Sequence, residues 1–427
     1  MSETATVAAP VAKPSEHAAF FRQSGWLMMA NIIGGFMTLG VHILNKRITA
    51  AEYSIFVTLL MVTACIPTTP LQMVFAQQTA QAVALNRQRQ LASMIRMTWL
   101  WSFILWALAA VVILYFQHDI AASWELPNTV GIWVTLPVLL VAVWMPLFSG
   151  ILQGDQDFFG LGWSLIFGGA GRLMLATILV IGLASQSTGM MAGALGGLGL
   201  QAGIAIWRSR HLWGGPGEAF PVRPLLVQIV PLMLGFGACQ FMFTSDTMFA
   251  KAFFDGEALK PYAAAGTLSR GLLWLVMPLA TVMFPKIVHS RVKKERSNLS
   301  GLVVLGTAAL AVCGGVGLWL FGPLVVKVIY ESGDVASAMA LIPWYAVAMI
   351  PLAMANVLAN DLLARGRFAV VPFMVLLAVA YGFGLPLMLH HFPGRLEVVL
   401  QTLAFFNLLL FGACALFAWV IKEKRPA

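Results

Sequence analysis

Three ionisable side chains stand inside long apolar runs of the sequence, where charge is costly. Arg172 lies within the run 161–183, Asp246 lies near the end of the run 225–249, and Arg270 lies within the run 262–284. A charge within hydrocarbon costs about 2.5–3.5 kcal/mol on insertion scales, so each group needs a partner or a wet cavity. These residues therefore predict an internal polar site.

Asp246 and Arg270 belong to successive runs that are joined by a short loop. Because a helix rises about 1.5 Å per residue, both charges are expected in the same leaflet, facing a shared polar cavity. Arg172 falls near the bilayer midplane, roughly half way along its run, so it must face the protein interior. We expect it to line the cavity, and a structural ion pair is the alternative.

Neutral polar residues accompany these charges. The first apolar run carries Asn31, and the second contains Pro67 and Pro70 before a polar stretch that includes Gln77. A helix bent by proline and lined with amides suits the wall of a cavity, because the freed carbonyls need partners. Interhelical hydrogen bonding is the alternative for any one of these amides. Gln240 completes the predicted substrate-binding set with Arg172, Arg270, Asn31 and Gln77.

Asp361 stands near the end of the tenth run and is followed by Arg365 and Arg367. Pairing with a local arginine is the favoured interpretation. Asp361 is kept with Asp246 and Tyr262 as a candidate for coupling or gating, since carboxylates within membranes mark ion and proton pathways.

The composition excludes an ordinary soluble domain. Hydrophobic residues make up 60% of the chain, charged residues 10%, and the mean hydropathy is +0.85. Soluble domains carry about a quarter charged residues. The sequence predicts an all-α polytopic membrane protein.

About 12 transmembrane helices are expected, because each needs roughly 20 apolar residues. The predicted spans are 24–44, 53–76, 97–116, 130–152, 161–183, 190–207, 225–249, 262–284, 302–321, 336–362, 370–389 and 398–421. They divide into a cytoplasmic tail (1–20), a six-helix lobe (21–207), a Gly- and Pro-rich linker (208–223), a second six-helix lobe (224–421) and a final tail (422–427).

A weak internal repeat supports this division. Tyr53 and Tyr262 each open the second span of a half. Pro146 with Gly154 and Phe158 likewise echoes Pro351 with Gly366 and Phe368 in the fourth spans. Duplicated halves are a common transporter plan, with the substrate site between them near the midplane.

The net charge of +9 could indicate nucleic-acid binding, but the distribution of the charges argues against it. Basic residues cluster at 87–96, 208–223 and 286–296, all on the side that holds both termini. The opposite side carries only Lys46, Arg47, Lys251, Lys260, Lys327 and Arg395. By the positive-inside rule, both termini are expected in the cytoplasm, with the chain in a bacterial inner membrane.

Enzymatic motifs are not found. The sequence offers no Ser, His and Asp set in its loops, no His or Cys cluster with metal spacing and no Walker-type phosphate loop. The four cysteines lie inside apolar runs, so a disulfide framework is not expected. We expect neither an enzyme nor a cofactor or metal site.

Three segments together resemble a known family: LFSGILQGDQDF followed by Arg172, SDTMFAKAFFDGEALKPYAAAGTLSR with MPLATVMFP, and NVLANDLLARGRF. They are similar to oligosaccharide flippases of the MATE-like multidrug/oligosaccharidyl-lipid/polysaccharide (MOP) exporter superfamily. The resemblance covers both halves. The chain differs at NKRITAAEY, where the family has a Leu-Gly-Pro turn, and it lacks the two extra helices of the lipid II flippase branch.

The resemblance implies two six-helix lobes around a central cavity that rock between inward-open and outward-open states. It also implies a lipid-linked oligosaccharide as cargo, with its pyrophosphate held by cavity arginines. Arg172 matches the arginine of the fifth span, Asp246 the acid of the seventh and Tyr262 the tyrosine of the eighth. Polysaccharide synthases or polymerases are the implied protein partners.

The residues themselves also favour an anionic cargo, since Arg172 and Arg270 outnumber Asp246 and arginine suits phosphate. The leading hypothesis is a flippase for a lipid-linked (polyprenyl-pyrophosphate) oligosaccharide or polysaccharide precursor. One alternative is a cation-coupled multidrug antiporter of the same superfamily, for which more cavity acids would be expected. A second is a non-transporting membrane component of a polysaccharide synthase complex.

Overall fold

The computed structural model describes residues 16–64, 66–123, 126, 129–220, 222–254, 256–293, 299–330 and 335–420. These residues form helices joined by short turns, with no β-strand among them. Eleven helices in the described ranges are long and apolar enough to cross a membrane. The prediction of an all-α polytopic fold is confirmed.

The helices follow one another with short connections. The first half contains α1 (Glu16–Gly40), α2 (Ala50–Ala64), α3 (Thr68–Ala84), α4 (Gln88–Tyr115), α5 (Gln117–Ser123), α6 (Val130–Gly154), α7 (Phe158–Thr177) and α8 (Gln186–Trp213). The second half contains α9 (Val222–Phe253), α10 (Gly256–Val292), α11 (Leu299–Tyr330), α12 (Val335–Ala364), α13 (Val371–His391) and α14 (Leu396–Ala415). Short 3-10 or π segments are η1 (Val41–Arg47), η2 (Ile178–Gly182), η3 (Phe368–Val370) and η4 (Leu416–Val420).

Several helices extend beyond their predicted spans, among them helices that reach into the predicted tail and linker. α1 begins at Glu16, inside the predicted tail, and α8 continues to Trp213, inside the predicted linker. Arg96 of α4 holds the end of α8, because its Nε donates to the carbonyl of Trp213 at 2.8 Å and its Nη2 contacts the carbonyl of Gly215. The parts of the predicted tails at 1–15 and 421–427 lie outside the described residues.

The second predicted span, 53–76, is two helices. α2 and α3 have 15 and 17 residues and are separated at Pro67, whose ring removes a backbone donor. Pro70 lies in the first turn of α3, where a missing N–H leaves no helical bond unmade. The predicted bend is confirmed as a full break. The broken helix and the eleven continuous spans together account for the predicted number of crossings.

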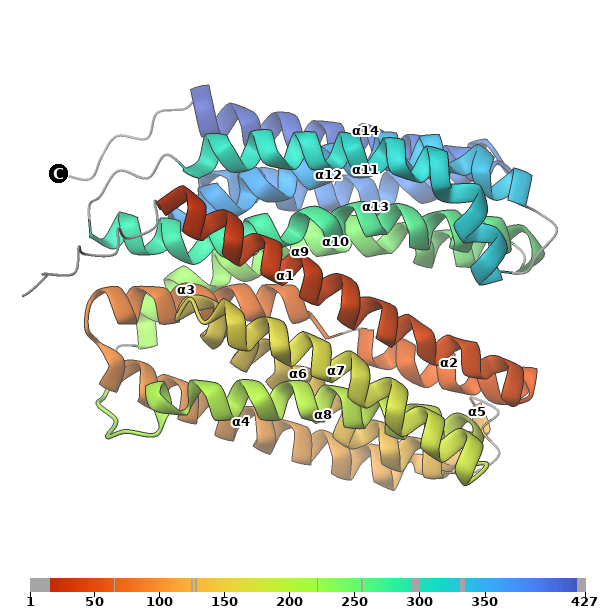
Figure 1. Ribbon diagram of the computed structural model, residues 1–427, viewed down its shortest axis with the longest axis horizontal. Coiled ribbons are helices and arrows are strands. Elements are labelled where there is room, and N and C mark those ends of the chain that lie inside the picture. Colours follow the sequence, from red (N-terminus) through yellow and green to blue (C-terminus); the bar gives the residue numbers. More distant parts are fainter. Residues whose placement is uncertain are drawn as a thin grey trace, which may run out of the picture.

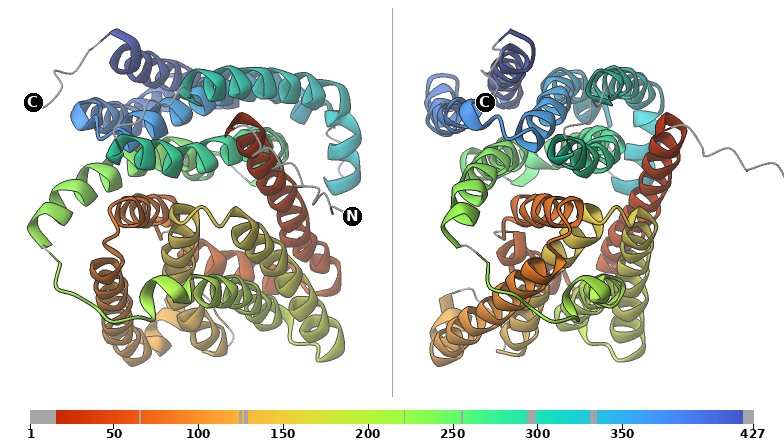
Figure 2. Two further views of the ribbon diagram at one scale, coloured as in Figure 1. Left: turned by 60° about the vertical axis from the view of Figure 1, so that its left-hand side comes forward. Right: turned by 90° about the vertical axis from the view of Figure 1, so that its left-hand side faces the viewer.

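The helices gather into two bundles. Figures 1 and 2 show α2–α8 as one body, the first bundle, and α9–α14 as another, the second bundle. α1 belongs to the first bundle and reaches across to the second. α1 packs on α7 of its own bundle and on α10 of the other, and α3 packs on both α9 and α10. We call the end with the α3–α4, α8–α9 and α12–α13 connections the arginine-rich end, which lies at the left in Figure 1.

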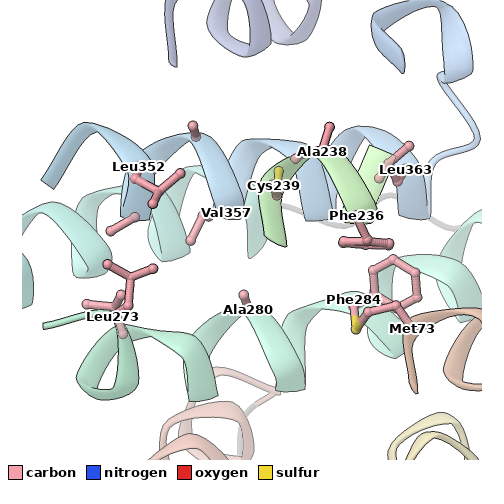
Figure 3. Packing of buried hydrophobic residues seen from close by; sticks show 14 of the residues in the cluster. Met73, Phe236, Ala238, Cys239, Leu273, Ala280, Phe284, Leu352, Val357 and Leu363 are labelled. Carbon is pink, nitrogen blue, oxygen red and sulfur yellow. The ribbon is translucent and has the colours of Figure 1, made fainter. Parts of the chain in front are cut away.

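Apolar packing joins the bundles through α3. Met73 of α3 lies beside Phe284 of α10 and Phe236 of α9 in Figure 3, and the two ring centroids are 5.9 Å apart. A second cluster belongs to the first bundle alone and lies toward the opposite, arginine-poor end. Its members are Val41, Leu44, Phe56, Leu59, Val138, Ala176, Val180, Met190 and Met191. The first bundle thus has its own core at that end.

Large apolar side chains cover the outside of the bundles. Leu105, Leu183, Leu305 and Phe383 are among those more than half exposed. A soluble protein rarely exposes so continuous an apolar surface. Because a lipid bilayer removes this cost, the exposed belt agrees with a multi-pass membrane protein.

Two turns at corresponding places of the two halves share one backbone pattern, which the α3–α4 turn at Asn86 also has. Gln156 in the α6–α7 turn and Gly366 in the α12–α13 turn both have a left-handed φ, +62° and +69°. Each turn also closes with equivalent backbone hydrogen bonds. The proline echo was out of register, because aligning the turns sets Gln156, not Gly154, against Gly366. The same alignment keeps Phe158 against Phe368, so the phenylalanine pair of the predicted echo holds, whereas the Pro146–Pro351 and Gly154–Gly366 pairs are wrong.

Candidate functional site

Asp246, Tyr262 and Arg270 form one buried polar site between α9 and α10. The Asp246 carboxylate is completely buried, and the Arg270 Nη2 lies 2.6 Å from each of its oxygens. The Tyr262 hydroxyl donates to Oδ2 at 2.8 Å. The structure thus brings together the acid and the base that the sequence placed in one leaflet.

A second layer of contacts holds the Arg270 guanidinium. Its Nη2 also donates to Thr247 Oγ1 at 2.6 Å, and its centre lies 5.9 Å from the Phe243 ring centroid. Tyr345 of α12 packs its ring 5.3 Å from that of Tyr262 and donates to the Tyr262 carbonyl at 3.4 Å. Both charges of the ion pair are therefore satisfied, as buried charges must be. The site connects α9, α10 and α12.

Gly266 makes this packing possible, and its substitution is a sharp test of it. A Cβ at position 266 would lie 2.6 Å from the Tyr345 hydroxyl and 3.0 Å from Arg270 Nη1. Since Tyr345 is fully buried and cannot move away, we expect Gly266→Ala to destabilise the protein by about 1–3 kcal/mol. The measurement is the thermal unfolding midpoint of the purified protein in detergent.

Gly271→Ala is the matched control, because a Cβ there meets nothing within 4 Å on the same helix. Alanine should be neutral or slightly stabilising at that position, by up to about 1 kcal/mol. Equal melting of the two variants would contradict the close packing around Tyr345.

Arg172 lies in the other bundle and has no such partners. Its Nε and Nη2 are buried and make no hydrogen bond to any described residue. Gly197 of α8 leaves room for it, because a Cβ there would lie 2.5 Å from the Arg172 Cβ. His42 of η1 is a titratable residue of the same half, and its Nδ1 lies 2.8 Å from the Tyr53 hydroxyl.

A cavity of about 180 Å³ lies between the bundles, lined by residues of α1, α3, α6, α7, α8 and α10. Its polar lining residues are Asn31, Gln72, Ser149, Gln201 and Thr281. Asn31 was predicted to line a cavity and does so. Neither arginine belongs to this lining, although α7 and α10, the helices that carry them, both contribute to it. The expectation that both face this one groove is therefore not met.

Gln153 of α6 connects the bundles beside this cavity. Its Oε1 accepts from Gln72 Nε2 at 2.9 Å, and its own Nε2 donates to the Thr281 carbonyl of α10 at 3.0 Å. The buried amide thus joins α3, α6 and α10 in one chain of hydrogen bonds. Such a chain stabilises the arrangement in which the bundles are closed at this level.

The remaining predicted residues lie apart from one another. Gln77 of α3 is fully buried, and its amide has no hydrogen-bond partner among the described residues. Gln240 is half-buried on α9. Asp361 pairs with Arg365 one turn later, with 2.9 Å between Oδ1 and Nε, so it has the local partner that the sequence favoured.

Sequence reasoning missed Gln153, Thr281 and Tyr345. The signal for Gln153 was available: Gly150 and Gly154 stand four residues apart, the spacing of close helix packing. Both approach the backbone of α3, where a Cβ would come within 2.5 Å of a carbonyl oxygen. Nothing in the sequence distinguished Tyr345 from a tyrosine at the membrane interface.

No protein-family model and no curated protein sequence matches this chain. Solved structures do. A MATE in complex with MaL6 superposes with a TM-score of 0.77 at 14% identity, covering 94% of this chain and 95% of that one. A MOP superfamily transporter from Pyrococcus furiosus gives 0.75 at 13%, covering 94% of each chain.

A mutant of the Vibrio cholerae MATE transporter VcmN gives 0.74 at 12% identity, covering 94% of this chain and 97% of that one. Likeness at such low identity shows the fold. The chain is therefore a multi-pass membrane protein with the fold of MATE/MOP superfamily transporters.

Proposed function

We propose that this protein moves a lipid-linked anionic glycan precursor, carried on a polyprenyl pyrophosphate, across the bacterial inner membrane. The observation that carries the proposal is the buried, unpaired guanidinium of Arg172. Asp246 and Arg270 neutralise each other. Of the three charged side chains within the apolar runs, Arg172 is therefore left without a counter-ion among the described residues. A guanidinium with two free donors is suited to a phosphate oxygen.

The bundle arrangement supports transport by alternating access. The hydrogen bond from Gln153 to Thr281 and the packing of Met73 hold the two bundles together beside the Asn31 cavity. Toward the arginine-poor end, the first bundle has a core of its own. We infer that the arginine-rich end faces the cytoplasm by the positive-inside rule. A bulky headgroup would then pass between the bundles while its polyprenyl tail stays in lipid.

The neighbouring folds are compatible with more than one cargo. One solved neighbour is a multidrug resistance MATE family transporter, whereas the Pyrococcus furiosus protein is described by a reversed polarity of its binding pocket that suggests a different function. Charge at the site, rather than the fold, must therefore decide the cargo. Here the paired Asp246 is unsuited to bind a cation, which favours the anionic precursor over a cationic drug.

Purified protein in proteoliposomes provides the test. The cargo is a polyprenyl pyrophosphate with a fluorescent oligosaccharide, and translocation is measured by its protection from a membrane-impermeant quencher. The control is the same lipid without the pyrophosphate. We expect the charged lipid to move and the neutral one to stay.

Two other outcomes would contradict the proposal. Uptake of a cationic dye driven by a proton or sodium gradient, without movement of the glycolipid, would identify an antiporter. No movement of any cargo, together with co-purification of a polysaccharide synthase, would identify a non-transporting partner of that enzyme.

A further inference from the structure

A second cavity between the bundles lies at the arginine-rich end and has a different chemistry. Its volume is about 150 Å³, and it is lined by α3 and α4 of the first bundle, by α9 of the second and by Phe220 of the connecting segment. It is separate from the Asp246 site and from the cavity beside Asn31, since it shares no lining residue with either.

The polar lining of this cavity consists of one arginine and four glutamines. Its members are Arg87, Gln78, Gln81, Gln90 and Gln228. Among the described residues that line it there is no aspartate or glutamate. Guanidinium and amide groups donate hydrogen bonds to phosphate and to hydroxyl groups, so this lining suits an anionic headgroup and offers nothing to neutralise a cation.

The rest of the lining is apolar and continues toward lipid. Leu91, Met94 and Leu225 line the cavity. The next residues of α9, Leu226 and Val227, are 52% and 66% exposed on the membrane-facing surface. A ligand with a charged head and an acyl chain would satisfy both parts of this lining, and it would reach the cavity from the bilayer.

The cavity spans the two bundles. Gln78 of α3 donates to Gln228 of α9 at 3.3 Å, and both side chains line it. A ligand that contacts this pair therefore contacts both bundles in the arrangement seen here. Because a ligand stabilises the state to which it binds more tightly, occupancy would favour the bundles being closed at this end.

We propose that this cavity binds the headgroup of an anionic phospholipid and that the bound lipid acts as a clamp between the bundles. The lipid surface is the source of the ligand, since the cavity lies beside the exposed apolar side chains of Leu226 and Val227 on α9. Anionic lipid is also the surface toward which juxtamembrane arginines are drawn. This site is independent of the proposed cargo.

Full-length protein in lipid nanodiscs tests the clamp. The unfolding midpoint is measured in phosphatidylcholine alone and in phosphatidylcholine with phosphatidylglycerol, and the difference is compared between variants. The native protein should melt higher with phosphatidylglycerol. Arg87→Gln should lose more than half of that rise, whereas Arg87→Lys should retain most of it.

Arg89→Gln is the matched control, because Arg89 is an exposed neighbour in the same turn and does not line the cavity. It should keep the full rise. Since each variant is compared with itself in the two lipids, a change in its intrinsic stability does not confuse the result.

Three results would overturn the proposal. The first is no rise for the native protein. The second is an equal loss in the Arg87→Gln and Arg89→Gln variants, which would indicate general surface attraction. The third is the same rise from inorganic phosphate added to phosphatidylcholine nanodiscs, which would make the ligand a soluble anion.

Discussion

An Arg172→Gln variant is expected to lose glycolipid translocation by about 10- to 100-fold while melting no lower than the native protein. The loss follows because hydrogen bonds to a charged group contribute about 1.5–3 kcal/mol and each 1.4 kcal/mol is a factor of ten. The unchanged stability follows because Arg172 Nε and Nη2 bond to no described residue, so glutamine removes a buried charge without leaving a partner behind. Transport and thermal unfolding are measured on the same preparation.

If Arg172 had only a structural role, the Arg172→Gln variant would give the opposite pair of results. Its unfolding midpoint would be lower than that of the native protein, and transport would fall in proportion. Arg89→Gln, which removes an exposed positive charge, is the control and should transport normally. Native transport by the Arg172→Gln variant would remove Arg172 from the cargo site and with it the main support for an anionic cargo.

Asp246→Ala is expected to produce the largest loss of stability, about 3–5 kcal/mol. This is the typical result of removing one partner from a buried ion pair, because the other charge is left without compensation. Arg270 is only 16% exposed, and it would lose both carboxylate contacts. The Tyr262 hydroxyl would also lose its acceptor. The unfolding midpoint in detergent and the yield of folded protein are the measurements.

The Asp246→Asn/Arg270→Gln double variant should recover a large part of this loss, because neutral amides can hydrogen-bond without a buried charge. With Asp246→Asn and Arg270→Gln as the single variants, the coupling energy from the double-mutant cycle should be well above the 0.5 kcal/mol or so within which independent sites add. Additive losses would mean that the two side chains do not depend on each other. If the repaired double variant also transports, Asp246 has a structural role and does not carry the coupling ion.

Local patterns in the sequence predicted the helices and a bend in the second span, which the structure shows as a break between α2 and α3. Proline chemistry acts within a few residues, so Pro67 indicated where the second span would bend. The meeting of Asp246 with Arg270 was also predictable, since a short loop joins their helices and rise per residue sets their depth.

Contacts between distant helices were not predictable in the same way. Arg172 and Arg270 were expected to line one cavity between the two lobes, but depth in the membrane does not say which side of its helix a side chain lies on, and neither lines the cavity beside Asn31. Gln153 is separated from Thr281 by more than a hundred residues, and only the assembled bundles bring its amide to that carbonyl. The cavity beside Arg87 likewise depends on α9 packing against α3, which no local spacing specifies.

The interruption at Pro67 makes the duplicated halves mechanically unequal. The counterpart of the broken helix is α10, which is continuous over 37 residues. One piece, α3, packs on α6 of its own bundle and also on α9 and α10 of the other, whereas the other piece, α2, packs on α6 and α8 of its own bundle. The first half can therefore change direction at Pro67, where the corresponding helix of the second half runs on without a break.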